Sequence, residues 1–452
     1  MENLDISKFG GTSVANFEAM TSSYKVVVAN KNTSVVVISA CSGVTNILVE
    51  LASGACSKEH TLELIEKLRK IHTEIIDNLP KYREDLLANL EQHLKEIYDL
   101  TQEANMGSSD ALTDRIVSHG ELMSTYIFTA LFNHYGTKAT WFDIRSIMRT
   151  DSKFGCATPL FEVLKTLSDE KLAPLVGKDS IIITQGFIAS NSEGQTTTLG
   201  RGGSDYSAAL LGEALGASTI SIWTDVPGVY TTDPRLVPHA KPIPELTYLE
   251  AAEMATFGAK ILHPSTLVPA VRRGIPVYVG SSKEPEKGGT WVRPQTETHP
   301  PFRAVALRKN QTLIVLASPK MVGASGFLAN VFSVFAKYGK SVDLVSTSEV
   351  SIAVTLDAGT QTSGKSNAIP QEMLDELRRF CHVKVENGLS LVAIIGNEMS
   401  SLPGITTQAF DSINRYAVRM ICYGASNHNL CFLLQEDKAV DALIEIHKHL
   451  LE

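Results

Sequence analysis

Four short stretches of the sequence combine glycines with charged residues of the kind that bind phosphate groups. They are "KFGGTS" (8–13), "TTTLGRGGSDYSA" (196–208), "WTDVPGVYTTDPR" (223–235) and "FGAKILHP" (257–264). In the second stretch, three glycines surround Arg201 and a Ser-Asp pair opens an expected helix. Exposed backbone N–H groups beside a helix N-terminus form a ready anion site. The alternative is an ordinary glycine-rich turn with Ser204 or Asp205 as the N-cap.

Each stretch taken singly has an ordinary explanation. Paired glycines as in "KFGGTS" are commonest in turns. The stretch 223–235 fits a surface loop as well as it fits a binding site. Lys260 fits a solvated helix residue as well as it fits a phosphate contact. Together, Lys8, Lys260 and Asp225 predict a positive, amide-lined pocket for phosphates. Phosphoryl transfer mainly requires positioning and neutralised phosphate oxygens, with magnesium bridging the phosphates. The P-loop pattern G-x-x-x-x-G-K-[ST] does not occur, and no dinucleotide fingerprint follows the first strand.

Apolar runs before these stretches indicate the elements that position them. "SVVVIS" (34–39) is a continuous β-branched run, typical of a buried strand, and a first strand is expected to end at Ile6. Further strands are expected at 179–190, 218–226 and 275–280, with a helix at 204–217. Strands that alternate with helices predict a largely parallel sheet covered on both faces. Ligands of such sheets bind beyond the carboxyl ends of the strands.

Long amphipathic helices are expected between the first strands. Apolar residues recur at spacings of three and four in 62–79 and 84–100, and Pro80 separates the two runs. These runs predict a helical hairpin whose charged residues form a solvated face. A longer helix is expected over 112–132.

An internal repeat follows a Pro-, Gly- and charge-rich boundary at 283–301. Each copy has the pattern strand, glycine-led helix, strand, strand, helix. The matching pairs, all at one offset, are Gly326 with Gly404, Phe332 with Phe410, Tyr338 with Tyr416 and Ser348 with Ser426. The first copy closes with a strand at 382–386, and the second has no equivalent. We expect the unassigned strand 302–308 to take that place, so that the first copy is threaded inside the second.

Bulk properties narrow the class of protein. A chain of 452 residues suggests about three domains, and 44% hydrophobic with 20% charged residues is the composition of a soluble globular protein. The net charge of −8 argues against a nucleic-acid platform. No leader and no apolar run long enough for a membrane span are evident. The six cysteines lack C-x-x-C spacing and are expected to be free thiols, so we expect a cytoplasmic protein. From the net charge and the absence of a long apolar run, we expect no nucleic-acid or membrane partner.

The motifs taken together resemble those of the aspartate kinases, members of the amino-acid kinase superfamily. The kinase-like stretches are "SKFGGTSV" (7–14), "VSHGELMS" (117–124), "TTLGRGGSDYSAALL" (197–211), "WTDVPGVYTTDPR" (223–235) and "EMATFGAKILHP" (253–264). The tail, with "GFLANVF" (326–332), "SVDLVSTSEVS" (341–351) and "MICYGASNHNLCFL" (420–433), resembles paired ACT regulatory domains. The likeness covers nearly the whole chain, in order, and is closest to the monofunctional, lysine-sensitive type.

The resemblance implies transfer of the γ-phosphoryl group of ATP, with magnesium, to the side-chain carboxylate of L-aspartate, giving 4-phospho-L-aspartate. Lys8 matches the lysine that stabilises the transferred group, and Asp205 matches the acid that orients it. Arg201 fits the α-carboxylate of aspartate, and Glu121 matches the residue that binds the α-ammonium. The other implied aspartate contacts are Thr45 and Ser204. The implied nucleotide contacts are Lys8, Gly10, Gly11, Thr224, Asp225, Tyr230, Arg235 and Lys260.

A general base is not expected, because a carboxylate nucleophile is already ionised at pH 7. His119 and His263 are therefore expected to be structural. No residue is assigned as a direct protein ligand of the metal.

The tail is implied to bind L-lysine as a feedback inhibitor. The matching residues are Met321, Ala324, Phe327, Leu328, Ser341, Val342, Asp343, Ser348 and Glu349. Asp343 can pair an ammonium, and loop amides before the "GFLANVF" helix suit a carboxylate. The lysine-sensitive type tends to have Ser where Ala324 stands, and the loss of one hydrogen bond, about 0.5–1.5 kcal/mol, would weaken lysine binding several-fold.

The implied fold is a three-layer αβα amino-acid kinase domain with a mainly parallel sheet (1–295), followed by two α+β ACT (βαββαβ) domains. The ACT domains are expected at 311–387 and at 302–309 plus 388–452. A homodimer through the ACT domains is expected, with a dimer of dimers as a further assembly. The alternatives are glutamate 5-kinase, acetylglutamate kinase or carbamate kinase, which lack this motif pairing with a two-copy ACT tail, and a catalytically silent amino-acid sensor. A fused homoserine dehydrogenase is not expected, because the sequence ends soon after the repeat.

Overall fold

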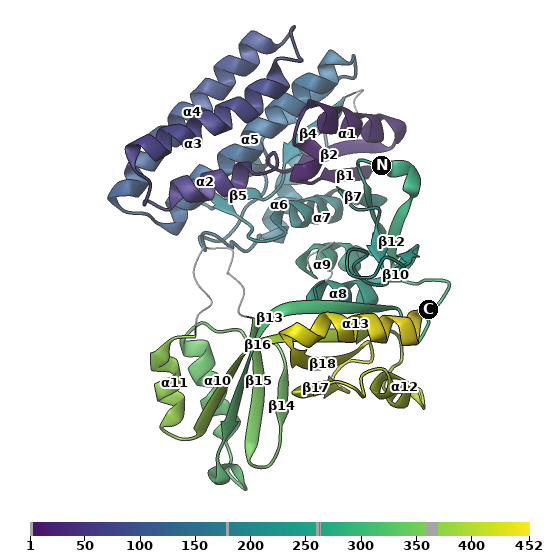
Figure 1. Ribbon diagram of the computed structural model, residues 1–452. Coiled ribbons are helices and arrows are strands. Elements are labelled where there is room, and N and C mark those ends of the chain that lie inside the picture. The colour runs from purple at the N-terminus through teal and green to yellow at the C-terminus, as the bar shows by residue number, and fades with distance from the viewer. Residues whose placement is uncertain (1–2, 178–179, 259–261, 263, 358–368) are drawn as a thin grey trace. The chain divides into compact units, whose positions relative to one another are not determined.

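The computed structural model describes residues 3–177, 180–258, 262, 264–357 and 369–452 (Figure 1). The chain divides into two compact units. The first unit comprises Met1–Val229, Pro242–Tyr248 and Ile261–Gln295, and the second comprises Tyr230–Lys241, Leu249–Lys260 and Thr296–Glu452. Two segments within the predicted catalytic range 1–295 thus group with the second unit. The predicted domain boundaries themselves stay a prediction.

The first unit is built on a mainly parallel sheet, as the sequence predicts. Eight strands of its described residues follow the order β10-β12-β11-β7-β1-β2-β4-β3. Their bounds are β1 Asp5–Phe9, β2 Thr33–Ile38, β3 Ala139–Phe142, β4 Ile181–Gln185, β7 Thr219–Thr224, β10 Glu245–Thr247, β11 Val277–Ser281 and β12 Gly289–Arg293. Strand β12 runs antiparallel to β11, and the other neighbouring pairs run parallel. Short strands elsewhere are β5 Ile188–Ser190, β6 Thr196–Thr198, β8 Val229–Tyr230 and β9 Pro242–Ile243.

Strand β1 continues beyond Ile6 to Phe9, so the expected end at Ile6 was wrong. Lys8 therefore lies inside the sheet, between Val37 of β2 and Ile222 of β7. Phe9 packs into the hydrophobic core shared with the long helices. Side chains alternate along a strand, so Lys8 points to the opposite face. A strand covered on both faces is buried throughout, as "DISKF" is.

Helices cover the sheet of the first unit. Their bounds are α1 Phe17–Ala29, α2 Val44–Ala52, α3 Lys58–Ile76, α4 Arg83–Met106, α5 Asp110–His134, α6 Phe161–Leu167, α7 Gly203–Leu215 and α9 Pro264–Arg273, with the single turns η1 Gly11–Val14, η2 Ile144–Ser146, η3 Ser168–Leu172 and η4 Pro285–Lys287. Helix α8 (Tyr248–Thr256) begins in the first unit and continues in the second. Helix α7 packs on α9 and β1, whereas α5 packs on α2, α4 and β3. Among the described helices, none has both the length and the apolar character needed to cross a membrane.

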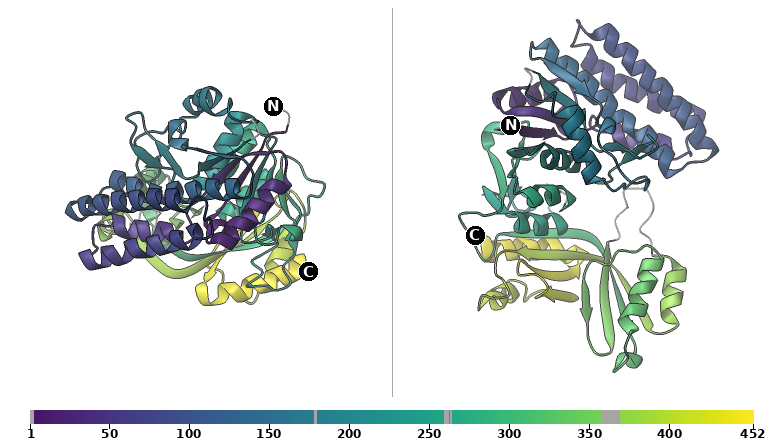
Figure 2. Two further views of the ribbon diagram at one scale, coloured as in Figure 1. Left: turned by 90° about the horizontal axis from the view of Figure 1, so that it is seen from above. Right: turned by 180° about the vertical axis from the view of Figure 1, so that it is seen from behind.

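Helices α3 and α4 form the predicted hairpin and lie beside α5, as the blue helices in both views of Figure 2 show. Helices α3 and α5 each follow a serine whose side chain caps the helix. Ser57 accepts a hydrogen bond from the N–H of His60, and Ser109 accepts one from the N–H of Leu112. Each bond satisfies an N–H group that has no partner within the helix. The apolar stripe of α3, with Leu64, Leu68 and Ile75, lies in the core.

The second unit contains an antiparallel sheet that holds both repeat copies. Six of its described strands follow the order β14-β15-β13-β16-β18-β17. The bounds are β13 Ala304–Ala317, β14 Val345–Thr347, β15 Ser351–Asp357, β16 His382–Ile395, β17 Met420–Tyr423 and β18 Asn429–Gln435. The helices are α10 Phe327–Lys337, α11 Gln371–Arg378, α12 Ile405–Asp411 and α13 Glu436–Leu451, with the turn η5 Pro319–Met321. The two edge strands of this sheet, β14 and β17, approach each other: Sγ of Cys422 lies 3.7 Å from the carbonyl oxygen of Val345.

Strand β13 belongs to both repeat copies. Its first part, Ala304–Arg308, pairs with Leu391–Ile395 of the second copy, and its later part, Leu313–Ala317, pairs with His382–Glu386 of the first. This is the pairing that the threaded arrangement requires. Phe302 and Val305 also lie in a core cluster with second-copy residues, which explains why an apolar strand precedes the first copy.

The repeat is visible in matched helix starts. Gly326 has φ 82° before α10, and Gly404 has φ 84° before α12. A Cβ at either position would meet no atom within 4 Å, so backbone conformation and not space accounts for both glycines. Each copy has its own core, built around Phe335 in the first and Phe432 in the second.

The six cysteines are free thiols, as expected from their spacing. Cys41, Cys381 and Cys431 are buried, Cys56 and Cys422 are half-buried, and Cys156 is exposed.

Candidate active site

Lys8 and Asp205 form an ion pair at the centre of the first unit. Nζ of Lys8 lies 2.6 Å from Oδ1 of Asp205, and the two side chains are 10% and 16% exposed. Lys8 reaches this position from β1, on the face of the sheet that α7 covers, and Asp205 lies in the first turn of α7. Two motifs far apart in the sequence are therefore brought together. A buried ammonium held by a carboxylate can stabilise charge on a phosphoryl group.

The glycines of "KFGGTS" let the chain turn closely at the end of β1. A Cβ on Gly10 would lie 3.5 Å from Nζ of Lys8, and one on Gly11 would lie 2.8 Å from the carbonyl oxygen of Ala40. The N–H of Gly10 donates to the carbonyl oxygen of Trp223 at 3.1 Å. Gly10 therefore favours a ligand by leaving room beside Lys8, and its N–H is already used within the protein.

The turn before α7 also depends on glycine. Gly200 and Gly202 have φ angles of 74° and 73°, which favour glycine, and they flank the exposed Arg201. A Cβ on Gly186 would lie 2.5 Å from Cβ of Ser204, so the end of β4 packs directly on the start of α7. Arg201 and Ser204 are thus placed at the N-terminal end of the helix that carries Asp205.

Glu121 is a buried carboxylate on α5. The residue is 3% exposed, and its Oε1 accepts a hydrogen bond from the N–H of Ala40 at 3.2 Å. Among the described residues no hydrogen-bond partner reaches the buried Oε2. Burial raises the pKa of Glu121 to about 8, although the Ala40 N–H and the charge of Lys8 both act to lower it. A buried acceptor of this kind suits a cationic group on a ligand.

Gly120 lets α5 approach the loop that follows β2. A Cβ at this position would lie 2.8 Å from Cβ of Ala40 and 3.2 Å from Cδ1 of Leu48. The same approach brings Glu121 to the N–H of Ala40. Thr45 lies, half-buried, in the first turn of the neighbouring helix α2.

A stripe of buried polar residues runs along α5 and includes Glu121. Asp114, Ser118, Glu121 and Thr125 are spaced by four, three and four residues, so they share one helix face. Asp114 accepts hydrogen bonds from the N–H groups of Gly155 and Thr198 and from the Thr198 hydroxyl. Asp114 is not among the predicted site residues, although polar residues at helical spacing in an apolar helix were a usable signal.

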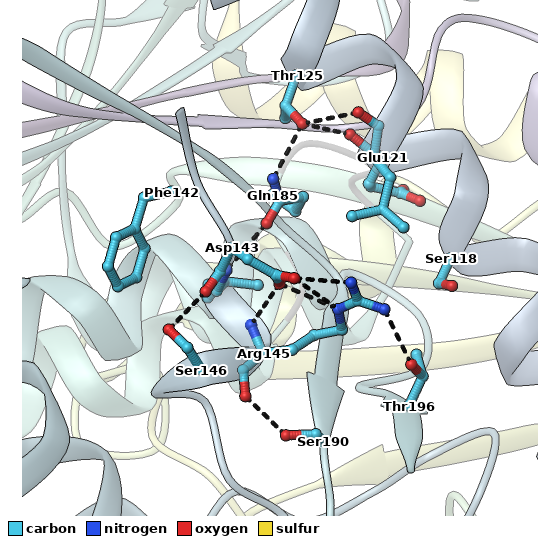
Figure 3. A network of polar contacts seen from close by, with 12 residues as sticks. Ser118, Glu121, Thr125, Phe142, Asp143, Arg145, Ser146, Gln185, Ser190 and Thr196 are labelled. Carbon is cyan, nitrogen blue, oxygen red and sulfur yellow. Dashed lines mark hydrogen bonds and ion pairs between the residues drawn. The ribbon is translucent and has the colours of Figure 1, made fainter. Parts of the chain in front are cut away.

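A polar network connects this stripe to the loops beyond the strands (Figure 3). Nε2 of Gln185, at the end of β4, donates to Oγ1 of Thr125 at 3.0 Å, and its Oε1 accepts from the N–H of Ile144 at 2.9 Å. Next to Ile144, Arg145 pairs with Asp143 at 2.7 Å and donates to Oγ1 of Thr196. Gln185 is likewise not among the predicted site residues. Its signal was a polar residue that closes the apolar run "IIITQ".

The proposed nucleotide residues are divided between the two units. Thr224 ends β7 in the first unit, and its hydroxyl donates to Asp225 at 3.1 Å. Tyr230 and Arg235 belong to the second unit, where Arg235 pairs with Asp233 at 2.7 Å. Lys260 and His263 lie outside the described residues.

The residues assigned to lysine binding lie in the first repeat copy of the second unit. Asp343 precedes β14 and pairs with Arg308 of β13 at 3.4 Å. The hydroxyl of Ser348 accepts from the N–H groups of Val350 and Ser351, so Ser348 shapes the β14–β15 turn. Of the remaining assigned positions, Phe327 and Leu328 begin α10, Met321 ends η5, and Ala324, Ser341, Val342 and Glu349 lie in the adjoining loops.

Known proteins match this chain over its length. Residues 4–281 match the amino acid kinase family, and residues 392–450 match an ACT domain. The chain is 50% identical over 452 residues to lysine-sensitive aspartokinase 3 of Escherichia coli strain K12, and the match covers 100% of both. The crystal structure of E. coli aspartokinase III in complex with aspartate and ADP has a TM-score of 0.92 at 49% identity, covering 99% of this chain and 100% of that chain. The complex of that enzyme with lysine and aspartate has a TM-score of 0.82 at 49% identity, covering 100% of both chains.

The family match covers more than half of the chain, and the similarity to the E. coli aspartokinase extends over its full length. The protein belongs to the aspartokinases, which are phosphotransferases of the amino acid kinase family that carry ACT domains.

Proposed function

We propose that the first unit transfers the γ-phosphoryl group of ATP to the side-chain carboxylate of L-aspartate, giving 4-phospho-L-aspartate. This reaction is the first step towards lysine, threonine and methionine, and towards diaminopimelate. The observation that carries the proposal is the buried ion pair between Lys8 and Asp205. Lys8 would neutralise the transferred group, and Asp205 would hold the lysine in place. A catalytically silent sensor has no need of this pair.

Glu121 and Arg201 would bind the two ends of the aspartate backbone. The carboxylate of Glu121 suits the α-ammonium, and the exposed Arg201 guanidinium suits the α-carboxylate through two parallel hydrogen bonds. Thr45 and Ser204 would complete the substrate site. Since the nucleophile is an ionised carboxylate, the reaction needs no proton acceptor.

The nucleotide would bind beside Lys8 and the glycines that follow it. Thr224, Asp225, Tyr230, Arg235 and Lys260 are the further contacts proposed. Magnesium, when bound with ATP, neutralises the charge on the phosphates. Asp205 offers a carboxylate oxygen, and magnesium prefers oxygen ligands of this kind. The site is therefore compatible with magnesium.

L-lysine is proposed to inhibit the enzyme through the second unit. Support comes from the E. coli relative, which is named lysine-sensitive and has been solved with lysine. Asp343 would bind the lysine ammonium after exchanging its present partner, Arg308. A homodimer through the ACT domains, a further association of dimers and a cytoplasmic location are additional parts of this proposal.

Aspartyl-hydroxamate formation with ATP and magnesium tests the reaction directly. Aspartate should be a substrate and glutamate should not. Lys8→Ala should lower kcat by more than about 100-fold, because it removes a charge that stabilises the transition state. Lys25→Ala, at an exposed position on α1, is the matched control and should keep full activity. Equal activity of the Lys8 variant and the wild type would overturn the proposal.

Titration of the same assay with lysine, threonine and methionine tests the effector. Lysine should inhibit the wild-type enzyme, and Asp343→Ala should abolish this inhibition while it leaves turnover unchanged. Inhibition that persists at equal strength in the variant would remove Asp343 from the lysine site.

A further inference from the structure

Helices α4 and α5 bring together two histidines and a glutamate whose ligand atoms form a compact group. His93 and Glu96 are three residues apart on α4 and therefore share a helix face, and His119 faces them from α5. One ring nitrogen from each histidine and one carboxylate oxygen of Glu96 all lie within 4.8 Å of one another. The two Nδ1 atoms of the histidines are 2.9 Å apart, and Nε2 of His119 lies 3.9 Å from Oε2 of Glu96.

Both imidazoles are held in the neutral form, which is the form that binds metals. Burial lowers the pKa of His119 to about 3, and the charges of His93, Arg145 and Arg115 lower it further. Burial also lowers the pKa of His93, against the opposing effect of Glu96. The hydrogen bond between the two Nδ1 atoms means that one ring carries its proton on Nδ1, and this proton must shift to Nε2 before both Nδ1 atoms can bind an ion.

The surroundings of this group tolerate a cation. Arg145 is paired with Asp143 at 2.7 Å, and Arg115 lies 3.6 Å from Glu103, so carboxylates offset the positive charges that face His119. The side chain of Glu96 is 49% exposed, whereas that of His119 is 7% exposed. An ion can therefore reach the group from solvent on the Glu96 side, and water can complete its coordination.

We propose that His93, Glu96 and His119 form a binding site for a divalent transition-metal ion, with zinc as the ion that fits best. Two imidazoles, one carboxylate and a water make a tetrahedral zinc site. Zinc ligands lie about 2.0–2.1 Å from the ion and hence about 3.3 Å from each other. The half-exposed Glu96 side chain can close the remaining distance by rotation. Magnesium, which prefers oxygen ligands, does not fit a site with two imidazoles.

The ion would join α4 to α5. His119 precedes Glu121 by two residues on α5, so the bound ion would hold the helical turn that leads into the proposed aspartate contact. The site itself is independent of the proposed reaction, because no residue of the group is assigned to substrate or nucleotide.

Zinc binding by the full chain tests the site. Metal-free protein is titrated with Zn²⁺ in competition with a chromophoric chelator, without nucleotide, and Co²⁺ is used as a spectroscopic probe of tetrahedral coordination. One zinc per chain is expected. His93→Gln and Glu96→Gln, both at partly or fully exposed positions, should each weaken binding by more than about tenfold, since even the indirect partners of metal ligands contribute that much.

Two controls separate this site from other zinc ligands. His134→Gln alters an exposed histidine on the same helix α5, and Cys156→Ser removes the exposed thiol. Both should bind zinc as the wild type does, and millimolar Mg²⁺ should not compete. The proposal is overturned if the wild type binds no zinc, if the His93 and Glu96 variants bind it as tightly as the wild type, or if Mg²⁺ displaces it. Circular dichroism of each variant confirms that its fold is retained.

Discussion

The guanidinium of Arg308 lies 3.4 Å from the carboxylate of Asp343, the residue proposed to bind the ammonium of lysine. Arg308 lies on β13, at the point where this strand pairs with Leu391 of the second repeat copy. The two side chains are 22% and 21% exposed, so the ion pair is only partly shielded from solvent. Lysine and Arg308 would therefore compete for one carboxylate.

Replacement of Arg308 should strengthen inhibition by lysine. Arg308→Gln removes the competing charge and keeps a polar side chain on β13. An ion pair of this exposure contributes about 0.2–1 kcal/mol, so the lysine concentration for half-inhibition should fall by up to about fivefold. Dose–response curves at fixed aspartate and ATP measure the change. Arg378→Gln, which breaks a surface pair with Asp375 on α11, is the control, and weaker inhibition of the Arg308 variant would contradict the competition.

Binding of aspartate should depend on pH through Glu121. Its pKa of about 8 in the free protein means that the carboxyl is mostly protonated at pH 7. Since the ammonium of aspartate binds the ionised form, binding must release a proton below pH 8. The dissociation constant of aspartate should therefore rise about fivefold as the pH falls from 8 to 7 and about tenfold from 7 to 6.

Calorimetric titrations in buffers of different ionisation enthalpy measure this proton release. Glu121→Gln should bind aspartate weakly and with little pH dependence between 6 and 8. Proton release that persists in this variant would assign the titration to another group.

Substitution of Gly120 should impair both packing and substrate binding. Gly120→Ala places a Cβ 2.8 Å from that of Ala40 and forces α5 away from the loop after β2. Overpacking of this kind costs about 1–3 kcal/mol of stability. Because Glu121 depends on the same approach, the KM for aspartate should rise while that for ATP changes little.

A glycine on the neighbouring helix end provides the control for this substitution. Gly107 follows the last residue of α4, and Gly107→Ala adds a Cβ that meets no atom within 4 Å. Its φ of 170° is extended backbone that alanine adopts readily. Thermal unfolding and steady-state kinetics of the two variants should differ clearly, and equal behaviour would contradict the role of Gly120.

Acid should destabilise the first unit through two buried histidines. Burial lowers the pKa of His72 to about 4 and that of His119 to about 3, so both are neutral in the folded chain. Unfolding exposes them and returns their pKa to about 6.5. The unfolded state then binds more protons, so stability is full above pH 6.5 and falls as the pH decreases towards 4. The loss is about 1.4 kcal/mol per pH unit for each histidine.

Urea unfolding followed between pH 7 and pH 5 measures this loss. His72→Leu removes one titrating ring from the core of α3 and should flatten the dependence of the unfolding midpoint on pH. His134→Gln, at an exposed site, should leave the slope unchanged. Parallel slopes in all three proteins would show that other groups control acid unfolding.

Local sequence patterns were sufficient to predict much of this fold. Continuous β-branched runs indicated the parallel strands, and apolar spacing with Pro80 indicated the hairpin of α3 and α4. Glycine spacing revealed the repeat, because Gly326 and Gly404 each meet the same backbone requirement at a helix start. These features depend on residues close together in the chain, so the sequence records them directly.

The sequence by itself determined which residues carry charge and the approximate positions of most helices and strands, and its motifs identified Lys8, Asp205 and Glu121 as candidates. Only the tertiary structure decided that β1 continues through Lys8 and pairs it with Asp205, and that Arg308 meets Asp343. The folded packing alone also set the protonation of Glu121 and His119. The physical reason is the same in each case: burial and ion pairing depend on atoms from distant parts of the chain, and local composition does not specify which of them meet.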